Sequence, residues 1–471
     1  MTILEQQGFF WWHDEPVPDD SLTPASYASG LLRIEDNGRS VVELDGYPPD
    51  PSDPMGKCIQ GLLKVSNERI LLSDLRWSGG EFRSNGISFT RFTAMNCLVG
   101  HDEAFPHGAQ VPEFDSLEIP LDGFEEWLGL GTIKVTRADG KILAGYEKPS
   151  DLSYDYDGGT LTITFDVTVD KSGMLGVHRL LLKQSALLRL QLNGTFSLQD
   201  LHLQYGMMED LIKLLTNSDY ALAWPRVSSP SGLTCQWYHT RTKHKESASA
   251  PEYHDTITRF SELREQFGSI WSKWIALREE IGSGAYMYFG TRRGPELYME
   301  HRFVSLIWGL ETFHRSRNTI KKSNALDEKI DRIINQITRK KDKDWLQNRL
   351  KDAREPNLAQ RLFEMFQTLP FGLQEAKMCA FSKSCAKRRN DLSHFGGQRQ
   401  DTPRLEFLQD LTRKSNALSI LYHAVLLRET GISDEILTRW FYKSFISFQI
   451  KFCFVEVGLL DPAVPQAPKP T

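Results

Sequence analysis

The sequence has no uninterrupted apolar run that approaches the roughly 20 residues needed to cross a bilayer. We therefore expect no membrane-spanning helix and no membrane partner. The first residues, MTILEQQGFFWWHDEP, also have no basic segment and turn acidic where a signal peptide would end. The apolar, aromatic and charged fractions of 40%, 11% and 25% are those of a globular protein that can bury sizeable cores.

Cysteine is scarce, and no two cysteines stand in a CxxC pair. Pairs of that kind mark disulfide-exchange motifs and many zinc sites. Without them, we expect reduced thiols and a cytoplasmic location. The six positions are Cys58, Cys97, Cys235, Cys379, Cys385 and Cys453.

Several catalytic signatures are also missing. The chain has no GxxxxGK[ST] phosphate loop, no GxGxxG after a strand, no HExxH and no GxSxG. The glycine-rich run at 282–290 has no lysine, and we interpret it as a turn between helices. Cys235, His239, His244 and His254 have zinc-binding atoms, but their spacing matches no common finger. We expect no metal and no cofactor.

Charge is divided unevenly along the chain. Residues 1–200 hold 16 Lys+Arg against 30 Asp+Glu, a balance of −14, whereas residues 201–471 hold 40 against 31, a balance of +9. The basic second half favours an anionic partner, with nucleic acid the first candidate. Two ordinary domains with different surfaces explain the division about equally well.

The first half has the pattern of β-strands. In residues 159–169 and 186–194, apolar residues alternate with polar ones, as expected for half-buried strands. We expect a turn at Asn193–Gly194 and a hairpin around Asp36–Asn37–Gly38. Turn residues recur at short intervals, so we predict a sandwich or barrel-like β domain with a few helices, such as one over 198–216.

The second half has the pattern of helices. Residues 226–251 are small and polar and predict a linker. Beyond them, apolar residues recur every three to four positions, and a long helix is predicted over 404–431 with a glycine stop. The proline-rich end is predicted to be disordered. The fold class is therefore α+β, with a β-rich domain followed by an all-α bundle.

One stretch, KRRNDLSHFGG at 387–397, places an arginine, an asparagine and a histidine close together at a predicted helix end. We place it on a helix from about Gly372 to His394, with Gly396–Gly397 as its C-cap. At about 100° per residue, Asn390 and His394 share a face, whereas Arg389 and His394 are about 140° apart. This favours a site built across a symmetric dimer.

These residue types suit RNA cleavage without a metal. A histidine transfers protons near neutral pH. Arg389 can bind a phosphate and stabilise the charge that develops in the transition state. Asn390 can orient the histidine or a phosphate oxygen. RNA supplies its own nucleophile, the 2′-OH. The competing interpretation is a helix cap, because such side chains also bind terminal carbonyls and complement the helix dipole. From the motif alone, the helix-cap interpretation has more support than RNA cleavage.

RNDLSH within a C-terminal helical bundle resembles the Rx4-6H motif of HEPN domains. The segment FVSLIWGLETFHRS with Glu311 is similar to the first helix of ApeA-like HEPN proteins. Three N-terminal segments resemble the β-rich domain of the same family: GLLRIEDNGRSVVELDG, IQGLLKVSNERILLSDL and FDSLEIPLDGFEEWLGL. The resemblance covers most of the chain in the right order.

The resemblance implies an anti-phage endoribonuclease that acts as a homodimer with a composite site. Its target would be RNA, often host tRNA, with translation arrest and abortive infection as the outcome. Arg389, Asn390 and His394 carry over as catalytic residues, with Glu311 and Asp391 as supporting residues. The expected RNA-binding residues are Lys383, Lys387, Arg388, Lys340 and Lys341.

We thus predict four segments: a β-rich domain (1–225) that senses a phage-derived trigger, a linker with a connecting helix (226–294), a HEPN bundle (295–455) and a tail (456–471). The alternatives are a HEPN module that binds nucleotide or RNA without cleaving it, and an interaction protein in which RNDLSH is only a helix cap.

Overall fold

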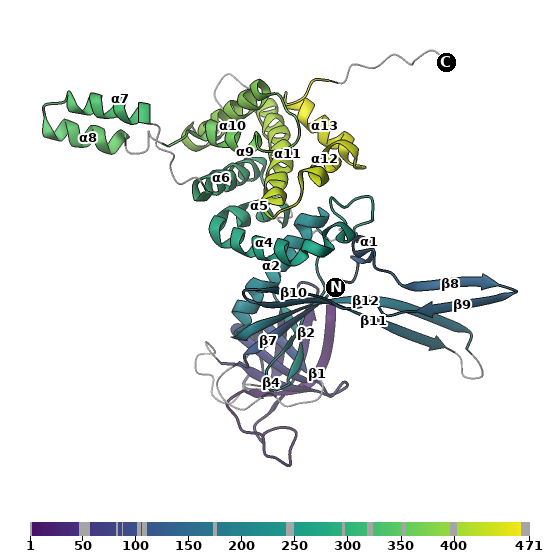
Figure 1. Ribbon diagram of the computed structural model, residues 1–471. Helices are drawn as coiled ribbons and strands as arrows, with labels where there is room; N and C mark the ends of the chain where they lie inside the picture. Colours follow the sequence, from purple (N-terminus) through teal and green to yellow (C-terminus); the bar gives the residue numbers. More distant parts are fainter. Residues whose placement is uncertain are drawn as a thin grey trace. The chain divides into compact units, whose positions relative to one another are not determined.

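The computed structural model describes residues 2–46, 57–81, 83–86, 88–100, 105, 111–172, 177–241, 249–293, 297–317, 324–350, 355–395 and 403–462. The side chains at 172, 324–327 and 394–395 lie outside this description. The chain forms two compact units (Figure 1). The first comprises Met1–Asp210, Tyr220–Pro251 and Arg259–Gly268, and the second Leu211–Asp219, Glu252–Thr258 and Ser269–Thr471.

Six strands of the first unit close into an antiparallel barrel. They pair in the order β6-β3-β2-β1-β4-β5, and β5 also pairs with β6, which completes the ring. A closed barrel leaves none of its strands as an open edge. The strands are β1 (Thr2–Trp12), β2 (Ala28–Glu35), β3 (Ser40–Asp45), β4 (Ile59–Leu63), β5 (Arg69–Glu81) and β6 (Phe89–Gly100).

The barrel core follows from the alternation of side chains along each strand. Residues two apart point to the same side, and Phe10 and Trp12 of β1 and Leu32 and Ile34 of β2 all point inward. All six strands contribute to this one cluster, which also holds Val42, Leu44, Ile59, Leu63, Ile70, Leu72, Leu75, Phe92, Ala94, Cys97 and Val99. The expected hairpin is present, with Gly38 at a φ of 77°.

Beyond β6 the same sheet continues, in the order β14-β13-β7-β12-β11-β10, and every pairing is antiparallel. These strands are β14 (Thr234–His239), β13 (Arg226–Ser228), β7 (Phe114–Pro120), β12 (Arg179–Phe196), β11 (Gly159–Ser172) and β10 (Leu152–Tyr156). A separate hairpin consists of β8 (Ile133–Ala138) and β9 (Lys141–Tyr146). Short helices α1 (Glu125–Leu128) and α3 (Phe260–Leu263) and a 3-10 turn, Arg264–Gln266, complete the unit.

Two sequence expectations for this unit are wrong. Asn193–Gly194 is not a turn between strands, because β12 runs on to Phe196 and its pairing with β7 shifts register after Gln191. Gly194, with a φ of 121°, fits such a bulge. The linker expected from 226 instead begins with β13 and β14, whose Cys235, Trp237 and His239 all point into the core.

The predicted helix over 198–216 is confirmed as α2 (Leu198–Thr216). The second unit contains α4 (Phe267–Ile281), α5 (Ser283–Arg293), α6 (Met299–Arg317), α7 (Asn324–Asn335), α8 (Lys340–Leu350), α9 (Leu358–Phe366), α10 (Glu375–Phe395), α11 (Arg404–Glu429), α12 (Asp434–Lys443) and α13 (Ser447–Glu456). The β-rich first unit and the helical second unit confirm the α+β fold class.

Helix α11 forms the centre of the second unit and packs against α6, α9, α12 and α13. It ends before Gly431, whose φ of 95° confirms the predicted glycine stop. The glycine-rich run expected as a turn is mostly α5. Its Gly284 lies where α5 meets α6, since a Cβ there would stand 3.1 Å from the Gly309 carbonyl oxygen. Gly284 thus allows close helix packing, and only Gly282 of this run lies in the turn.

No helix in the described part of the chain is both long and apolar enough to cross a membrane. The predicted helix of 372–394 is found as α10, which begins at Glu375 and ends at Phe395. The expected cap at 396–397 and most of the expected tail, 463–471, lie outside the described residues.

A buried histidine links α11 to α5 and to the end of α2. His423 Nε2 donates to the Leu214 carbonyl at 2.8 Å, so Nδ1 is the acceptor for the Tyr288 hydroxyl at 2.6 Å. Arg292 Nη1 lies 3.3 Å from the same Nδ1. Burial first, and then this guanidinium, lower the pKa of His423 to about 3. The ring is therefore neutral in the folded protein at any ordinary pH.

This histidine makes stability depend on pH. An unfolded histidine has a pKa of about 6.5, so between pH 6.5 and 3 the unfolded state binds the extra proton. The unfolding free energy must then fall as the pH drops through this window, by up to about 1.4 kcal/mol per pH unit. His423→Gln should flatten that slope in denaturant unfolding followed by circular dichroism at 222 nm. The exposed His178→Gln is the control, and an unchanged slope in the His423 variant would contradict the assignment.

Candidate active site

The motif residues lie on the last turns of α10. Lys383, Lys387 and Asn390 are exposed. Together with position 394 they fall within about 60° of one another around a helix of 3.6 residues per turn. The backbone of His394 belongs to α10, whereas its side chain lies outside the described residues. An exposed stripe with two lysines thus leads along the helix to the position of the histidine.

Arg389 lies off this stripe and points to a different helix. Its Nη2 is 3.3 Å from Oε2 of Glu311 on α6, and its Nη1 donates to Asn390 Oδ1 at 3.3 Å. The side chain is 25% exposed, and its buried Nε has no hydrogen-bond partner among the described residues. The structure therefore brings together three of the predicted site residues, Arg389, Asn390 and Glu311.

Glu311 is the centre of a larger arginine cluster. Its Oε1 is 3.2 Å from Nη2 of Arg315, one turn further along α6, and 3.5 Å from Nη1 of Arg361 on α9. Glu355 pairs with both of these arginines. Three guanidinium groups meet two carboxylates here, which leaves one excess positive charge beside Arg389. Such an excess favours binding of an anion, and a guanidinium group can bind a phosphate through two parallel hydrogen bonds.

Sequence reasoning missed Arg315, Arg361 and Glu355. The four-residue spacing of Glu311 and Arg315 on one helix was a usable signal, because side chains at that spacing meet. No spacing connects α6 with Arg361, which reaches Glu311 only through the packing of α9 against α6.

The neighbouring Arg388 has a different setting. Its Nε donates to Asp410 of α11 at 2.6 Å, and its Nη1 lies 3.9 Å from the buried carboxylate of Asp391. Lys414 also pairs with Asp410. Burial acts to raise the pKa of Asp410, but the hydrogen bonds from Lys414 and Arg388 outweigh it and lower this pKa overall. Arg388 therefore joins α10 to α11, and Asp391 lies beside it on α10.

The remaining residues expected to bind RNA are Lys340 and Lys341. Both are exposed at the start of α8, as Lys383 and Lys387 are on α10. Side chains of this kind attract a phosphate backbone mainly through charge, with an affinity that falls as salt rises.

The residues considered for zinc do not form one site. Cys235 and His239 are buried in β14, and His239 lies among aromatic rings, including Trp237 at 4.5 Å between centroids. Burial, followed by the nearby Arg241, lowers the pKa of His239 to about 2. His244 lies outside the described residues.

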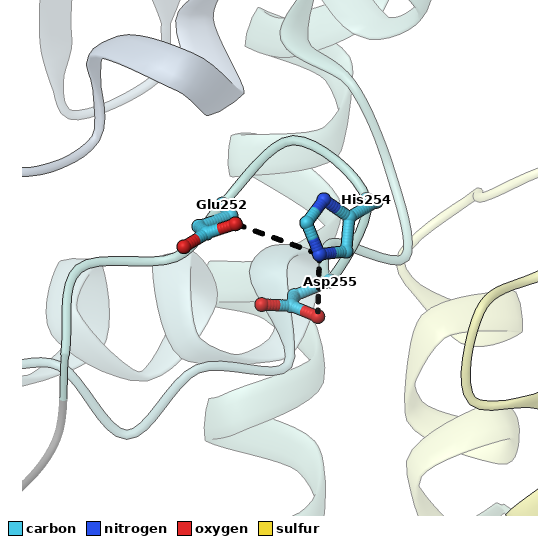
Figure 2. Close-up of side chains that lie close together, drawn as sticks. All are labelled: Glu252, His254 and Asp255. Carbon is cyan, nitrogen blue, oxygen red and sulfur yellow. Dashed lines mark ion pairs between the residues drawn. The ribbon is translucent and has the colours of Figure 1, made fainter.

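His254 is close to two carboxylates in an exposed loop (Figure 2). Its Nε2 lies 3.5 Å from Glu252 and 3.8 Å from Asp255. Within the described part of the chain, this is the one group of three or more potential ligands that lie close together. All three side chains are exposed, and surface groups of this kind commonly form ion pairs without a metal, so the group does not indicate a metal site.

Comparison with known families gives two matches along the chain. The family of ApeA N-terminal domain 1 matches residues 5–274, and the family of Apea-like HEPN domains matches residues 304–436. The second match includes Glu311, Arg361 and the whole RNDLSH motif. Neither the comparison with curated proteins nor that with solved structures gave a match. Because the first family covers more than half of the sequence, the chain belongs to the ApeA-like family of HEPN-type anti-phage proteins.

Proposed function

We propose that this protein is a metal-independent endoribonuclease that cleaves RNA, with host tRNA as the target, during defence against phage. The observation that carries the proposal is the placement of Arg389. Glu311 of α6 holds its guanidinium, and the exposed lysine stripe ends at position 394 on the same helix. HEPN domains in general are nucleases that bind RNA and form dimers.

The chemistry uses a nucleophile that RNA provides. In the proposed reaction His394 accepts the proton of the 2′-OH, and the 2′-oxygen forms a bond to phosphorus. The bond from phosphorus to the 5′-oxygen then breaks, the leaving oxygen takes a proton from water, and His394 returns its own proton to solvent. The products are a 2′,3′-cyclic phosphate and a 5′-OH. Arg389 stabilises the charge that builds on the phosphate oxygens, and Asn390 orients Arg389 through their hydrogen bond.

Helix geometry supports a dimer. Arg389 and position 394 are about 140° apart around α10, and the ion pair with Glu311 directs Arg389 toward α6. We infer that Arg389 of one subunit works with His394 of the other.

In the proposed function the β-rich unit senses a phage-derived trigger, and cleavage leads to translation arrest and abortive infection. The HEPN module that only binds RNA is the competing function.

Removing either catalytic side chain tests the proposal directly. Arg389→Ala and His394→Ala should each lower RNA cleavage by about 10³-fold, because charge stabilisation and proton transfer each contribute that order of rate. The measurement is single-turnover cleavage of purified tRNA, with sequencing of the RNA ends. Lys451→Ala, on α13, which carries no predicted site residue, is the control. If the protein only binds RNA, the wild type will show no cleavage. If RNDLSH is only a helix cap, the variants will show lowered thermal stability and the wild type no cleavage to lose.

Dependence on metal is a separate test. Cleavage should persist in excess EDTA, because RNA supplies the nucleophile and the proton transfers need only histidine and water. The products should carry a cyclic phosphate, detected by a ligase that accepts only such ends. An absolute need for added divalent metal would contradict the mechanism even if Arg389 and His394 proved essential.

Mixing the two inactive variants tests the composite site. A heterodimer of Arg389→Ala with His394→Ala retains one intact arginine and one intact histidine, on opposite subunits. If the two act across the dimer, part of the activity should return on mixing, whereas neither homodimer should cleave. Tagged subunits isolated as heterodimers give the measurement. A heterodimer as inactive as its parents would show that each pair acts within one subunit.

A further inference from the structure

Arg361 is a charged side chain in an unusually buried place. It lies on the first turn of α9 and is 4% exposed. A buried guanidinium requires partners, and two of its three nitrogens form hydrogen bonds. Its Nε donates to the Pro356 carbonyl at 2.7 Å, and its Nη2 donates to Glu355. Its Nη1 forms an ion pair with Glu311 Oε1 at 3.5 Å, without a hydrogen bond among the described residues. These contacts fix the direction in which Arg361 approaches Glu311.

Glu311 divides its two oxygens between different partners. Oε1 faces Arg361 and Arg315, whereas Oε2 faces Arg389. The carboxylate is planar, so a contact that fixes one oxygen also fixes where the other one points. Arg361 therefore determines where the carboxylate can hold Arg389.

Arg315 lies closer to Oε1, at 3.2 Å, but it is less constrained. Its side chain is 59% exposed, and exposed ion pairs between flexible side chains contribute little. Arg361 is held by the backbone of Pro356 and by burial, so its position costs no further ordering when RNA binds. A planar guanidinium also presents several donors in a fixed fork, which lysine does not.

We propose that Arg361 is a positioning residue, which acts through Glu311 to hold Arg389 in the orientation that the phosphate needs. The inference rests on the proposed RNA cleavage. It assigns a role to a residue on α9, a helix that carries no part of the RNDLSH motif.

Arg361→Lys, which keeps the charge and loses the fork, tests the inference. It should lower kcat for RNA cleavage by about tenfold to a hundredfold, the size of effect that a small displacement of a catalytic group produces. KM should stay within about twofold, because Arg361 does not touch the substrate. In a Glu311→Gln background the same substitution should have a much smaller effect, since the link to Arg389 is already weakened.

A matched control is Arg317→Lys. Arg317 is also a paired arginine of the helical unit, but its partners are Glu280 and Glu429 rather than Glu311. It should leave kcat unchanged. If Arg361→Lys also left kcat unchanged, or lowered it equally with and without Glu311, the inference would be overturned. A loss of kcat explained by a lowered thermal midpoint in both arginine variants would overturn it as well.

Chemical reactivity of Arg389 gives a test that needs no activity. Phenylglyoxal modifies accessible guanidinium groups, and peptide mass spectrometry measures the rate at Arg389. Loosening of the Glu311 carboxylate in Arg361→Lys should raise this rate, and Arg317→Lys should not. If the wild type failed to cleave RNA but this rate still rose, the proposed function would fail while the positioning link stood. An unchanged rate would overturn the link itself.

Discussion

The ion pair between Glu311 and Arg389 connects the two helices that carry the site. Glu311 comes from the helix that packs on the central α11, and Arg389 comes from the end of α10. Charges that are largely removed from water must be paired, and a single carboxylate here serves three guanidinium groups. The positions of α6, α9 and α10 are therefore coupled through one side chain, and the excess positive charge remains at the surface beside Arg389.

The need to pair buried charges also explains why neighbouring residues of the motif have different partners. Arg388 pairs with Asp410 of α11 and so joins two helices, and the buried Asp391 lies 3.9 Å from Arg388 on α10. Arg389 points toward α6, and Asn390 and the lysines face solvent. Successive residues of a helix turn by about 100°. A run of charged residues thus supplies an ion pair to α11, an arginine held by Glu311 and an exposed basic stripe at once.

The β-rich unit depends on closure of a barrel rather than on ion pairs. Six strands close on themselves around one apolar cluster, and the remaining strands extend the sheet from β6. The pairing of β5 with β6 is what turns an open sheet into a barrel, because it removes the edges that would otherwise remain. The unit matches its own family, separate from the family that matches the helical unit.

The sequence by itself determined the order of the two units, the hairpin at Gly38, the helices α2, α10 and α11, and the motif on α10, because these depend on local periodicity and turn residues. It also pointed to Glu311 through resemblance. It did not determine the course of β12 past Asn193–Gly194, the strands after residue 226, or the role of Gly284. Each of these depends on a partner distant in sequence: β7, β6 and α6. For the same reason only the tertiary structure revealed Arg361, since its contact with Glu311 exists only where α9 packs on α6.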